Sequence, residues 1–262
     1  MGINNPIGVF DSGLGGLTVV KELMRELPLE DIIYYGDTAR VPYGTKSREA
    51  ILRFSKENTQ ALLKHKVKMV VVACNSSSSH ALAALKREFT LPIVGVIHAG
   101  AKKAVQTTRN RKIGVIATSA TISSEEYTKT IHWYDAGVKV FSQACPLLVP
   151  LVEEGWVNKD ITLKIVQEYL APLKKAGIDT LILGCTHYPL LKDDFKKVMG
   201  KEVTLIDSAK EVALEVKQIL GEMQTMHSPG RKAKYRFIAT DRPQAFEKIA
   251  RNFLGYPVKM EV

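Results

Sequence analysis

The sequence has few cysteines and no feature typical of a membrane or disulfide-bonded protein. Its 262 residues include three cysteines, which are far apart and form no Cys-x-x-Cys pair. This argues against a disulfide framework or a zinc ribbon and leaves reduced thiols available for chemistry. No apolar run approaches the roughly 20 residues that span a bilayer, and the N-terminus lacks a signal-peptide pattern. We therefore expect a cytoplasmic protein without a membrane partner.

Nucleotide-binding and metal-binding motifs are also missing. The glycine-rich segment 11–16 does not fit Gly-x-Gly-x-x-Gly, because position 18 is Thr18. We therefore expect no nucleotide cofactor and no metal. The segment follows a predicted strand and opens a predicted helix, where free backbone N–H groups favour an anion. Asp11 is interpreted either as a buried or capping carboxylate or as a group that tunes a nearby thiol.

The charge of the chain is strongly one-sided, with a formal net charge of +10 at pH 7. A basic chain can bind nucleic acid. Here the basic clusters are interrupted by acidic or apolar residues and lack the interleaved aromatics of a base-stacking surface. We interpret them as solvated faces, do not expect nucleic acid as a partner, and note that the same field would steer an anionic small substrate.

Strand-like apolar runs alternate with helical patterns along the whole chain. Strands are expected at residues 7–10, 32–35, 69–73, 93–97, 112–117, 138–142, 180–183, 205–207 and 235–239. Helices are expected at residues 17–27, 48–64, 79–88, 123–136, 161–175, 209–223 and 246–254. This alternation is typical of βα units around a parallel sheet, so we predict an α/β fold.

The second half of the sequence restarts the pattern of the first. Residues 7–12, Ile-Gly-Val-Phe-Asp-Ser, align with residues 113–118, Ile-Gly-Val-Ile-Ala-Thr, at an offset of 106 positions. We predict two similar domains with mostly parallel central sheets, related by pseudo-symmetry. Open α/β sheets bind ligands at the C-terminal ends of their strands. The active site is therefore expected in the cleft between the two domains.

Two of the cysteines repeat one local setting. Cys74 follows the run Val-Val-Val-Ala and precedes Asn75, and 111 positions later Cys185 follows Leu-Ile-Leu-Gly and precedes Thr186. Cysteine has a reference pKa of about 8.5 and reacts as a thiolate. Two thiols on opposite sides of one carbon can remove a proton from one face and return one to the other, which predicts racemisation. Taken alone, Cys74 is equally well interpreted as an inert buried thiol.

Polar residues next to both cysteines suit an amino-acid substrate. Cys74 is expected at a helix N-terminus, which lowers thiol pKa values, and Asn75 and Ser76 offer amide and hydroxyl groups to a carboxylate or an ammonium. His187, two residues after Cys185, is a candidate acid, base or orienting group.

The loop at residues 37–45 also leaves a strand end. Arg40 is interpreted either as a planar clamp for a carboxylate or as an outward-pointing turn residue. The turn that contains Tyr43 and Gly44 would expose backbone N–H groups to the same ligand. The residues alone do not separate these alternatives.

Four further polar residues have weaker signals. Cys145 has no counterpart in the repeat and is predicted to be a packing thiol. Glu153 and Glu154 are expected to face solvent rather than the cleft. His98 either lines the cleft or marks the hinge between the domains.

Four long motifs occur in an order that is specific to one family. They are residues 8–16 (GVFDSGLGG), 35–44 (YGDTARVPYG), 72–75 (VACN) and 184–191 (GCTHYPLL). With them the chain resembles the glutamate racemases of the aspartate/glutamate racemase family over nearly its whole length. The family usually reads Cys-Asn-Thr-Ala after the first thiol, whereas this chain has Ser76 and Ser77. Serine keeps the hydroxyl of threonine but loses its methyl group, which would loosen the seat of the substrate.

The resemblance implies a cofactor-independent racemase that supplies D-glutamate for peptidoglycan precursor synthesis. Cys74 would take the α-proton from D-glutamate and Cys185 from L-glutamate, with Asp11 and His187 assisting the neighbouring thiols. The substrate-binding residues implied by the motifs are Asp11, Ser12, Tyr43, Gly44, Asn75, Ser76, Thr186 and His187.

The resemblance also guides the domain division. We expect a first domain of residues 1–97 plus 208–262, which carries Cys74, and a second domain of residues 98–207, which carries Cys185. We also expect a homodimer. Two alternatives stay open: a two-thiol racemase that acts on aspartate or a related amino acid, and a regulatory or nucleic-acid-associated binding protein on the same scaffold.

Overall fold

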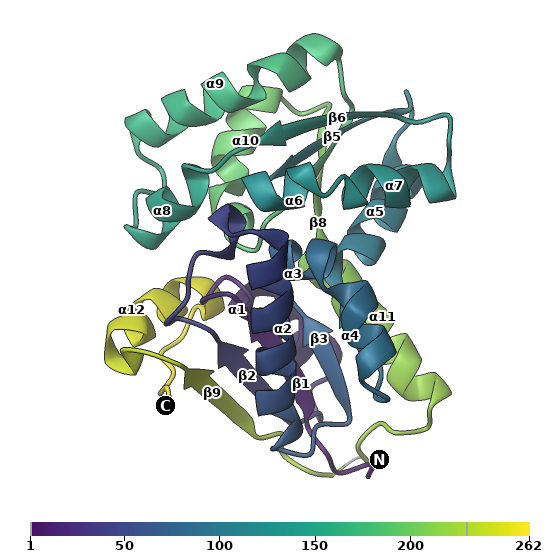
Figure 1. Cartoon of the computed structure of the whole chain (residues 1–262). Coiled ribbons are helices and arrows are strands. Elements are labelled where there is room, and N and C mark those ends of the chain that lie inside the picture. The colour runs from purple at the N-terminus through teal and green to yellow at the C-terminus, as the bar shows by residue number, and fades with distance from the viewer. Residues whose placement is uncertain (1, 229) are drawn as a thin grey trace.

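The computed structural model describes residues 2–228 and 230–262 and forms two lobes, each built around a parallel sheet (Figure 1). The sheet of the first lobe has the strand order β4-β3-β1-β2-β9. Its strands are β1 (Ile7–Asp11), β2 (Ile32–Gly36), β3 (Met69–Val72), β4 (Ile93–Gly95) and β9 (Tyr235–Ala239). The C-terminal segment thus returns to the first lobe, because β9 pairs with β2.

The second sheet repeats the topology of the first. Its strands are β5 (Lys112–Ala117), β6 (Lys139–Ala144), β7 (Thr180–Gly184) and β8 (Thr204–Asp207), in the order β6-β5-β7-β8. Read from its other edge, this order is β8-β7-β5-β6, so β5 corresponds to β1 and β7 to β3. All strand pairs in both sheets are parallel. The predicted α/β class and the pseudo-symmetric pair of sheets are confirmed.

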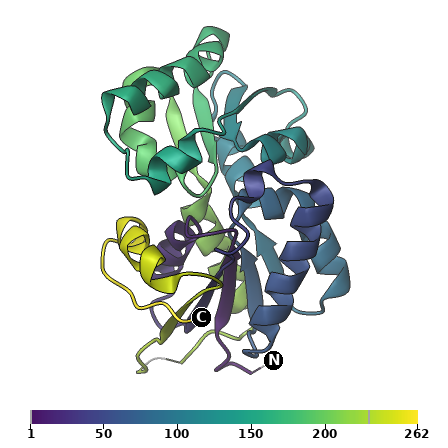
Figure 2. The ribbon, with the colours of Figure 1, turned by 60° about the vertical axis from the view of Figure 1, so that its left-hand side comes forward.

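Helices cover both faces of each sheet, as expected for strands that are apolar on both sides. In the first lobe α1 (Leu17–Glu26), α11 (Ser208–Glu222) and α12 (Pro243–Leu254) lie on one face, and α2 (Arg48–Leu63) and α4 (Leu82–Glu88) on the other (Figure 2). Side chains alternate between the two faces along each strand. Val9 and Val71 pack against the face that α1 and α11 cover, and Phe10 and Val70 pack against the face that α2 and α4 cover.

The second lobe is layered in the same way. Its helices are α6 (Ser119–Ser123), α7 (Glu126–Tyr134), α8 (Leu148–Glu153), α9 (Asp160–Ala176) and α10 (Lys192–Met199). Residues of α8, α9 and α10 pack on one face of the sheet, and α7 packs on the other. Two short 3-10 turns, at Tyr43–Thr45 and Tyr188–Leu191, and α3 (Asn75–His80) lie next to the junction of the lobes.

Two helices connect the lobes. Helix α5 (Val96–Thr107) leads from β4 to β5, and α11 leads from β8 back toward β9. They touch closely, because a Cβ atom on Gly100 would lie 2.3 Å from Ser208 Oγ. At the start of α11, Asp207 caps the helix by accepting a hydrogen bond from the Ala209 N–H at 3.0 Å. The junction therefore depends on small residues where the two connectors meet.

Several predicted boundaries were wrong, each at a local break of the pattern. The strand expected at 93–97 ends at Gly95, where α5 begins. Two helices replace the one expected at 79–88: α3 begins at Asn75, α4 begins at Leu82, and Ala81 separates them. The helix expected at 123–136 is interrupted by Glu125 with a left-handed φ of 57°. Helices α5, α8 and α10 were not predicted.

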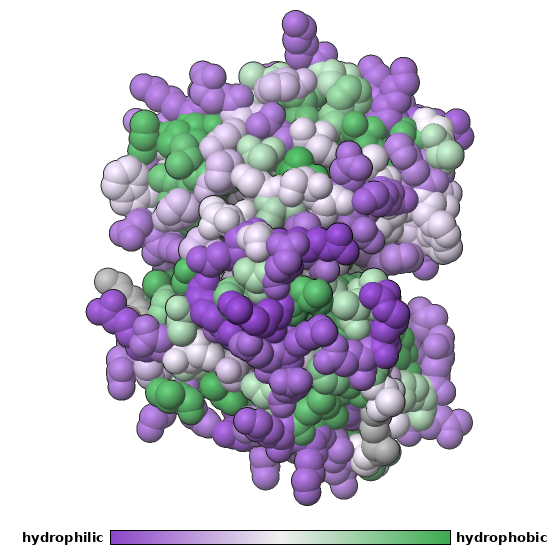
Figure 3. All heavy atoms as spheres, in the orientation of Figure 1, coloured by the Kyte–Doolittle hydropathy of each residue, from purple (hydrophilic) through white to green (hydrophobic). Residues whose placement is uncertain are grey.

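The visible face of the molecule is largely hydrophilic, with apolar residues interspersed in both lobes (Figure 3). Among the described residues, no helix is long and apolar enough to cross a membrane.

Candidate active site

A cavity of about 280 Å³ lies between the lobes, and both repeated cysteines line it. Cys74 and Cys185 are free thiols that are almost completely buried. The remaining lining residues are Ser12, Val41, Pro42, Tyr43, Gly44, Thr45, Asn75, Ser76, Thr118, Pro146, Val149, Pro150, Glu153, Thr186 and His187. The predicted common pocket of the two thiols is therefore present.

Corresponding strands place the two thiols. Cys74 lies two residues after the end of β3 and is the N-cap residue of α3, and Cys185 follows directly on β7. Since β3 and β7 occupy equivalent positions in the two sheets, each thiol leaves the C-terminal edge of its own sheet. The pseudo-symmetry brings these edges together at the cavity.

The surroundings of Cys74 are neutral or negatively charged. Its thiol donates a hydrogen bond to Ser12 Oγ at 3.6 Å. Burial, together with the negative charge of Asp11, raises the pKa of Cys74 to about 11. The helix N-terminus lowers this pKa through the Ser77 backbone N–H, as predicted, but does not overcome the burial. Cys74 is thus a protonated thiol at neutral pH in the absence of a ligand.

The surroundings of Cys185 contain a cation. His187 Nδ1 lies 3.9 Å from Cys185 Sγ, and His187 Nε2 lies 3.0 Å from Glu153 Oε1. Burial opposes the charge on the imidazole, but the hydrogen bonds to Cys185 and Glu153 outweigh it and raise the pKa of His187 to about 10. His187 is therefore an imidazolium at neutral pH and places a positive charge beside the Cys185 sulfur.

The C-terminal segment completes the surroundings of His187. The ring of Phe253, on α12, meets the imidazole edge-on at 5.5 Å between ring centres. Helix α12 packs on α1 and β9 of the first lobe (Figure 2). His187 follows β7 in the second lobe. The orientation of His187 therefore depends on packing between the lobes as well as on Glu153.

Asp11 occupies the anion position that the sequence predicted at segment 11–16. Its carboxylate accepts a hydrogen bond from the Gly13 N–H at 3.0 Å, and the Gly16 N–H also stabilises it. The segment therefore binds the protein's own carboxylate rather than an external anion. Asp11 is completely buried and does not line the cavity. Burial raises its pKa, and the positive charge of His187 opposes this rise.

The other predicted substrate-binding residues do line the cavity, with one qualification. Ser12, Gly44, Asn75, Ser76 and Thr186 all face it. Tyr43 also lines it, but its hydroxyl is bonded to Asp37 and accepts a hydrogen bond from Asn58 Nδ2 at 3.1 Å. The Tyr43 hydroxyl is thus committed elsewhere, which leaves the backbone of the turn, as the sequence suggested, to face a ligand.

Two glycines allow the lobes to approach each other at the cavity. A Cβ atom on Gly15 would lie 2.2 Å from Thr186 Oγ1, and one on Gly44 would lie 2.6 Å from Thr118 Cβ. Both neighbours belong to the second lobe. Glycine is therefore required here for close packing across the cleft.

Two functional residues were missed. Thr118 lines the cavity, and its Oγ1 lies 3.0 Å from Ser76 Oγ. The repeat alignment could have found Thr118, because it pairs this residue with Ser12. Glu153 was expected to face solvent, but it contacts His187 and lines the cavity. Its position follows from the unpredicted helix α8, and no sequence signal indicated it.

Three further expectations are now settled. Arg40 does not line the cavity, because its guanidinium pairs with Asp37 and Glu57. Glu154 is exposed and Cys145 is a buried packing thiol, as predicted.

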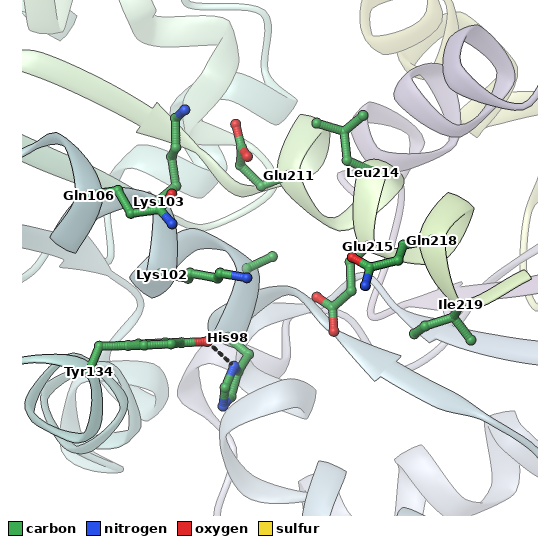
Figure 4. Close-up of a pocket in the computed structure, with 11 residues that line it drawn as sticks. His98, Lys102, Lys103, Gln106, Tyr134, Glu211, Leu214, Glu215, Gln218 and Ile219 are labelled. Atoms are coloured by element: carbon green, nitrogen blue, oxygen red, sulfur yellow. Dashed lines mark hydrogen bonds between the residues drawn. The ribbon is translucent and has the colours of Figure 1, made fainter. Parts of the chain in front are cut away.

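His98 lies outside the cleft. It lines a separate groove between α5, α7 and α11, where its Nδ1 is hydrogen-bonded to the Tyr134 hydroxyl at 2.8 Å (Figure 4). Of the two alternatives for His98, a position in the cleft is therefore wrong, and the residue lies on the connecting helix α5. Within residues 2–228 and 230–262, no group of three or more His, Cys, Asp or Glu side chains could hold a metal ion.

Known proteins of similar sequence and structure are racemases. A family model described as Asp/Glu/hydantoin racemase matches residues 7–216. The chain belongs to this family. The racemase is 47% identical to a glutamate racemase of Geobacter metallireducens, over 95% of this chain and 92% of that relative.

Solved racemase structures have the same fold over nearly the whole chain. A glutamate racemase isoform from Bacillus anthracis is 44% identical and superposes with a TM-score of 0.95, covering 98% of this racemase and 96% of that chain. A glutamate racemase from Francisella tularensis, solved in complex with D-glutamate, is 39% identical and has a TM-score of 0.92, with the same coverage of 98% and 96%.

Proposed function

We propose that the chain interconverts L-glutamate and D-glutamate by proton transfer between two thiols, without a cofactor. The observation that carries this proposal is that Cys74 and Cys185, one from each lobe, line a single cavity of small-molecule size. The glutamate racemases among its relatives and the D-glutamate bound to the Francisella tularensis protein support glutamate as the substrate. The product supplies peptidoglycan precursor synthesis in the cytoplasm.

Each thiol serves one face of the α-carbon. In the direction from D-glutamate, Cys74 first loses its thiol proton to solvent. Its thiolate then takes the α-proton, the electron pair stays on the substrate as a carbanion, and the Cys185 thiol donates its proton to the opposite face. L-glutamate leaves, Cys74 is then a thiol and Cys185 a thiolate, and the reverse reaction starts from this state. Atoms and charges balance without a redox partner.

The α-proton is far less acidic than a thiol, so the cavity must stabilise the carbanion. Without an electron sink, fixed hydrogen-bond donors in a site that excludes water do this best. The buried amide of Asn75 and the hydroxyls of Ser12, Ser76 and Thr186 support this role, because all of them face the cavity. Asp11, beside Cys74, and His187, beside Cys185, assist the two proton transfers.

We also propose the domain division and a homodimer. Residues 1–97 with 208–262 form one domain and residues 98–207 the other, which is supported by the confinement of each sheet to one of these sets. A second copy is assigned to the surface around α8, where Leu147, Trp156 and Ile161 are exposed. Sedimentation of the native protein and of Trp156→Asp tests the dimer, which this substitution should weaken.

Exchange of the α-proton with solvent tests the reaction. In deuterium oxide, the protein should convert each glutamate enantiomer into the other, with deuterium at the α-carbon of the product. Proton NMR and a chiral assay measure this, and both aspartate enantiomers are run in parallel. A preference for aspartate would overturn the choice of substrate, and the absence of exchange with either amino acid would overturn the racemase proposal.

A further inference from the structure

Tyr127 touches the neighbours of both cysteines. It lies on α7 in the second lobe and is buried. Its hydroxyl donates a hydrogen bond to Asn75 Oδ1, in the first lobe, at 2.7 Å. Its ring packs against the residue before the second thiol, because a Cβ atom on Gly184 would lie 3.1 Å from Tyr127 Cε2. One side chain therefore spans the distance between the two cysteine segments.

The hydrogen bond also decides which end of the Asn75 amide is free. An asparagine side chain has one acceptor oxygen and one donor NH₂ group. Tyr127 engages the oxygen, and no hydrogen bond among residues 2–228 and 230–262 uses Asn75 Nδ2. Since Asn75 lines the cavity, its NH₂ group is the end available to a ligand. A donor of this kind suits a carboxylate and not an ammonium.

The same hydroxyl is linked to the junction of the connecting helices. Ser208 Oγ, at the start of α11, lies 3.4 Å from the Tyr127 hydroxyl. Because Tyr127 donates to Asn75, Ser208 is the donor in this contact. Ser208 is also the residue that α5 approaches at Gly100. The contacts Ser208 to Tyr127 to Asn75 thus run from the interlobe junction to the cavity.

We infer that Tyr127 is a positioning residue of the racemase, which holds the Asn75 NH₂ group toward the substrate carboxylate and fixes the spacing of the two cysteine segments. The inference rests on the proposed function. Tyr127 itself does not line the cavity and so is not assigned a contact with the substrate. Its ring sets the spacing, and its hydroxyl sets the orientation of the amide.

Removing the hydroxyl alone separates these two roles. Tyr127→Phe keeps the ring, so we expect the KM for both glutamate enantiomers to rise about fivefold to tenfold, with kcat within about threefold, as for loss of one oriented hydrogen bond. In an Asn75→Ala background, Tyr127→Phe should change KM no further, because the two residues act together. Thermal unfolding of each variant reports on folding separately.

Tyr134→Phe is the matched control. It removes a tyrosine hydroxyl from the same helix, whose partner is His98 in the separate groove, and should leave KM unchanged. An unchanged KM in Tyr127→Phe, or an effect that adds fully to that of Asn75→Ala, overturns the inference. Failure of the wild-type protein to racemise glutamate would instead refute the proposed function. If the wild type acts on aspartate, the same variants are measured with aspartate, which carries the same α-carboxylate.

Discussion

The two halves of the cavity share a backbone plan but differ in charge. Cys74 and Cys185 leave equivalent strands, yet Cys74 has the buried carboxylate of Asp11 nearby, while Cys185 has the His187 imidazolium. The twin position of Asp11 in the repeat is Ala117. Pseudo-symmetry thus supplies the opposed geometry of the thiols, while their neighbours differ in charge. In the ligand-free protein burial and the nearby carboxylate favour the protonated thiol at Cys74.

Removing either thiol should have the largest effect. Cys74→Ala and Cys185→Ala should each lower racemisation by more than about 10³-fold, because each face of the α-carbon loses its only acid and base. A chiral assay from both enantiomers measures this. Cys145→Ala, the control, removes a buried packing thiol and should retain activity within about threefold. A single cysteine variant with full activity would refute the two-thiol mechanism.

Separating the halves should have the next largest effect. Gly15→Ala places a methyl group 2.2 Å from Thr186 Oγ1, so the second lobe must move away from segment 11–16. We expect kcat/KM to fall by about 10²-fold, as small displacements of reacting groups do in other enzymes. Gly155→Ala is the control for loss of stability alone. A Cβ atom there would have no neighbour within 4 Å, but the left-handed φ of +72° disfavours alanine. Normal kcat/KM in Gly15→Ala would show that the close approach is not needed.

Replacing the charged neighbour of each thiol by a neutral residue tests the difference in charge between the two halves of the cavity. Asp11→Asn removes the negative charge that raises the pKa of Cys74, so alkylation of Cys74 at pH 8 should become about tenfold faster for each unit of pKa lost. His187→Asn removes the adjacent cation, so alkylation of Cys185 should become slower. Mass spectrometry of iodoacetamide-treated protein measures both sites in one sample. Changes of the same sign at the two thiols would contradict the proposed asymmetry.

Weakening the contact between His187 and Glu153 should have the smallest effect, and the size of this effect should depend on pH. The pKa of His187 is raised to about 10 in the folded protein, against about 6.5 in an unfolded chain. Its contribution to stability is therefore complete below about pH 6.5 and is lost as the pH rises through 10. Glu153→Gln should lower the Tm by about 2–4 °C at pH 7, equivalent to about 1 kcal/mol.

The pH dependence of the Tm difference between wild type and Glu153→Gln is the control for this prediction. The gap in Tm between wild type and Glu153→Gln should narrow above pH 10, where His187 is neutral in both proteins. Glu154→Gln alters the exposed neighbouring carboxylate and should leave the Tm unchanged. A gap that stays constant from pH 6 to pH 10.5 would show that Glu153 acts without the charge on His187.

Much of the fold could be predicted because its signals are local. Apolar runs located the strands, and the repeated setting of Cys74 and Cys185 indicated a shared cavity. Thr118 was within reach of the same reasoning through its alignment with Ser12. The predictions failed where local patterns are weak: α8 is six residues long and contains Pro150, so its periodicity is too short to detect, and Glu153 on it was assigned to solvent.

The sequence by itself determined the α/β class, the internal repeat, the two cysteines and most of the polar residues that line the cavity. Only the tertiary structure decided how those residues are charged and held. The pKa values of Cys74 and His187 depend on burial and on partners that lie far away in the chain, such as Asp11 and Glu153. The contact of Tyr127 with Asn75 likewise joins residues from different lobes. Such pairings arise from packing between elements, which local sequence patterns do not encode.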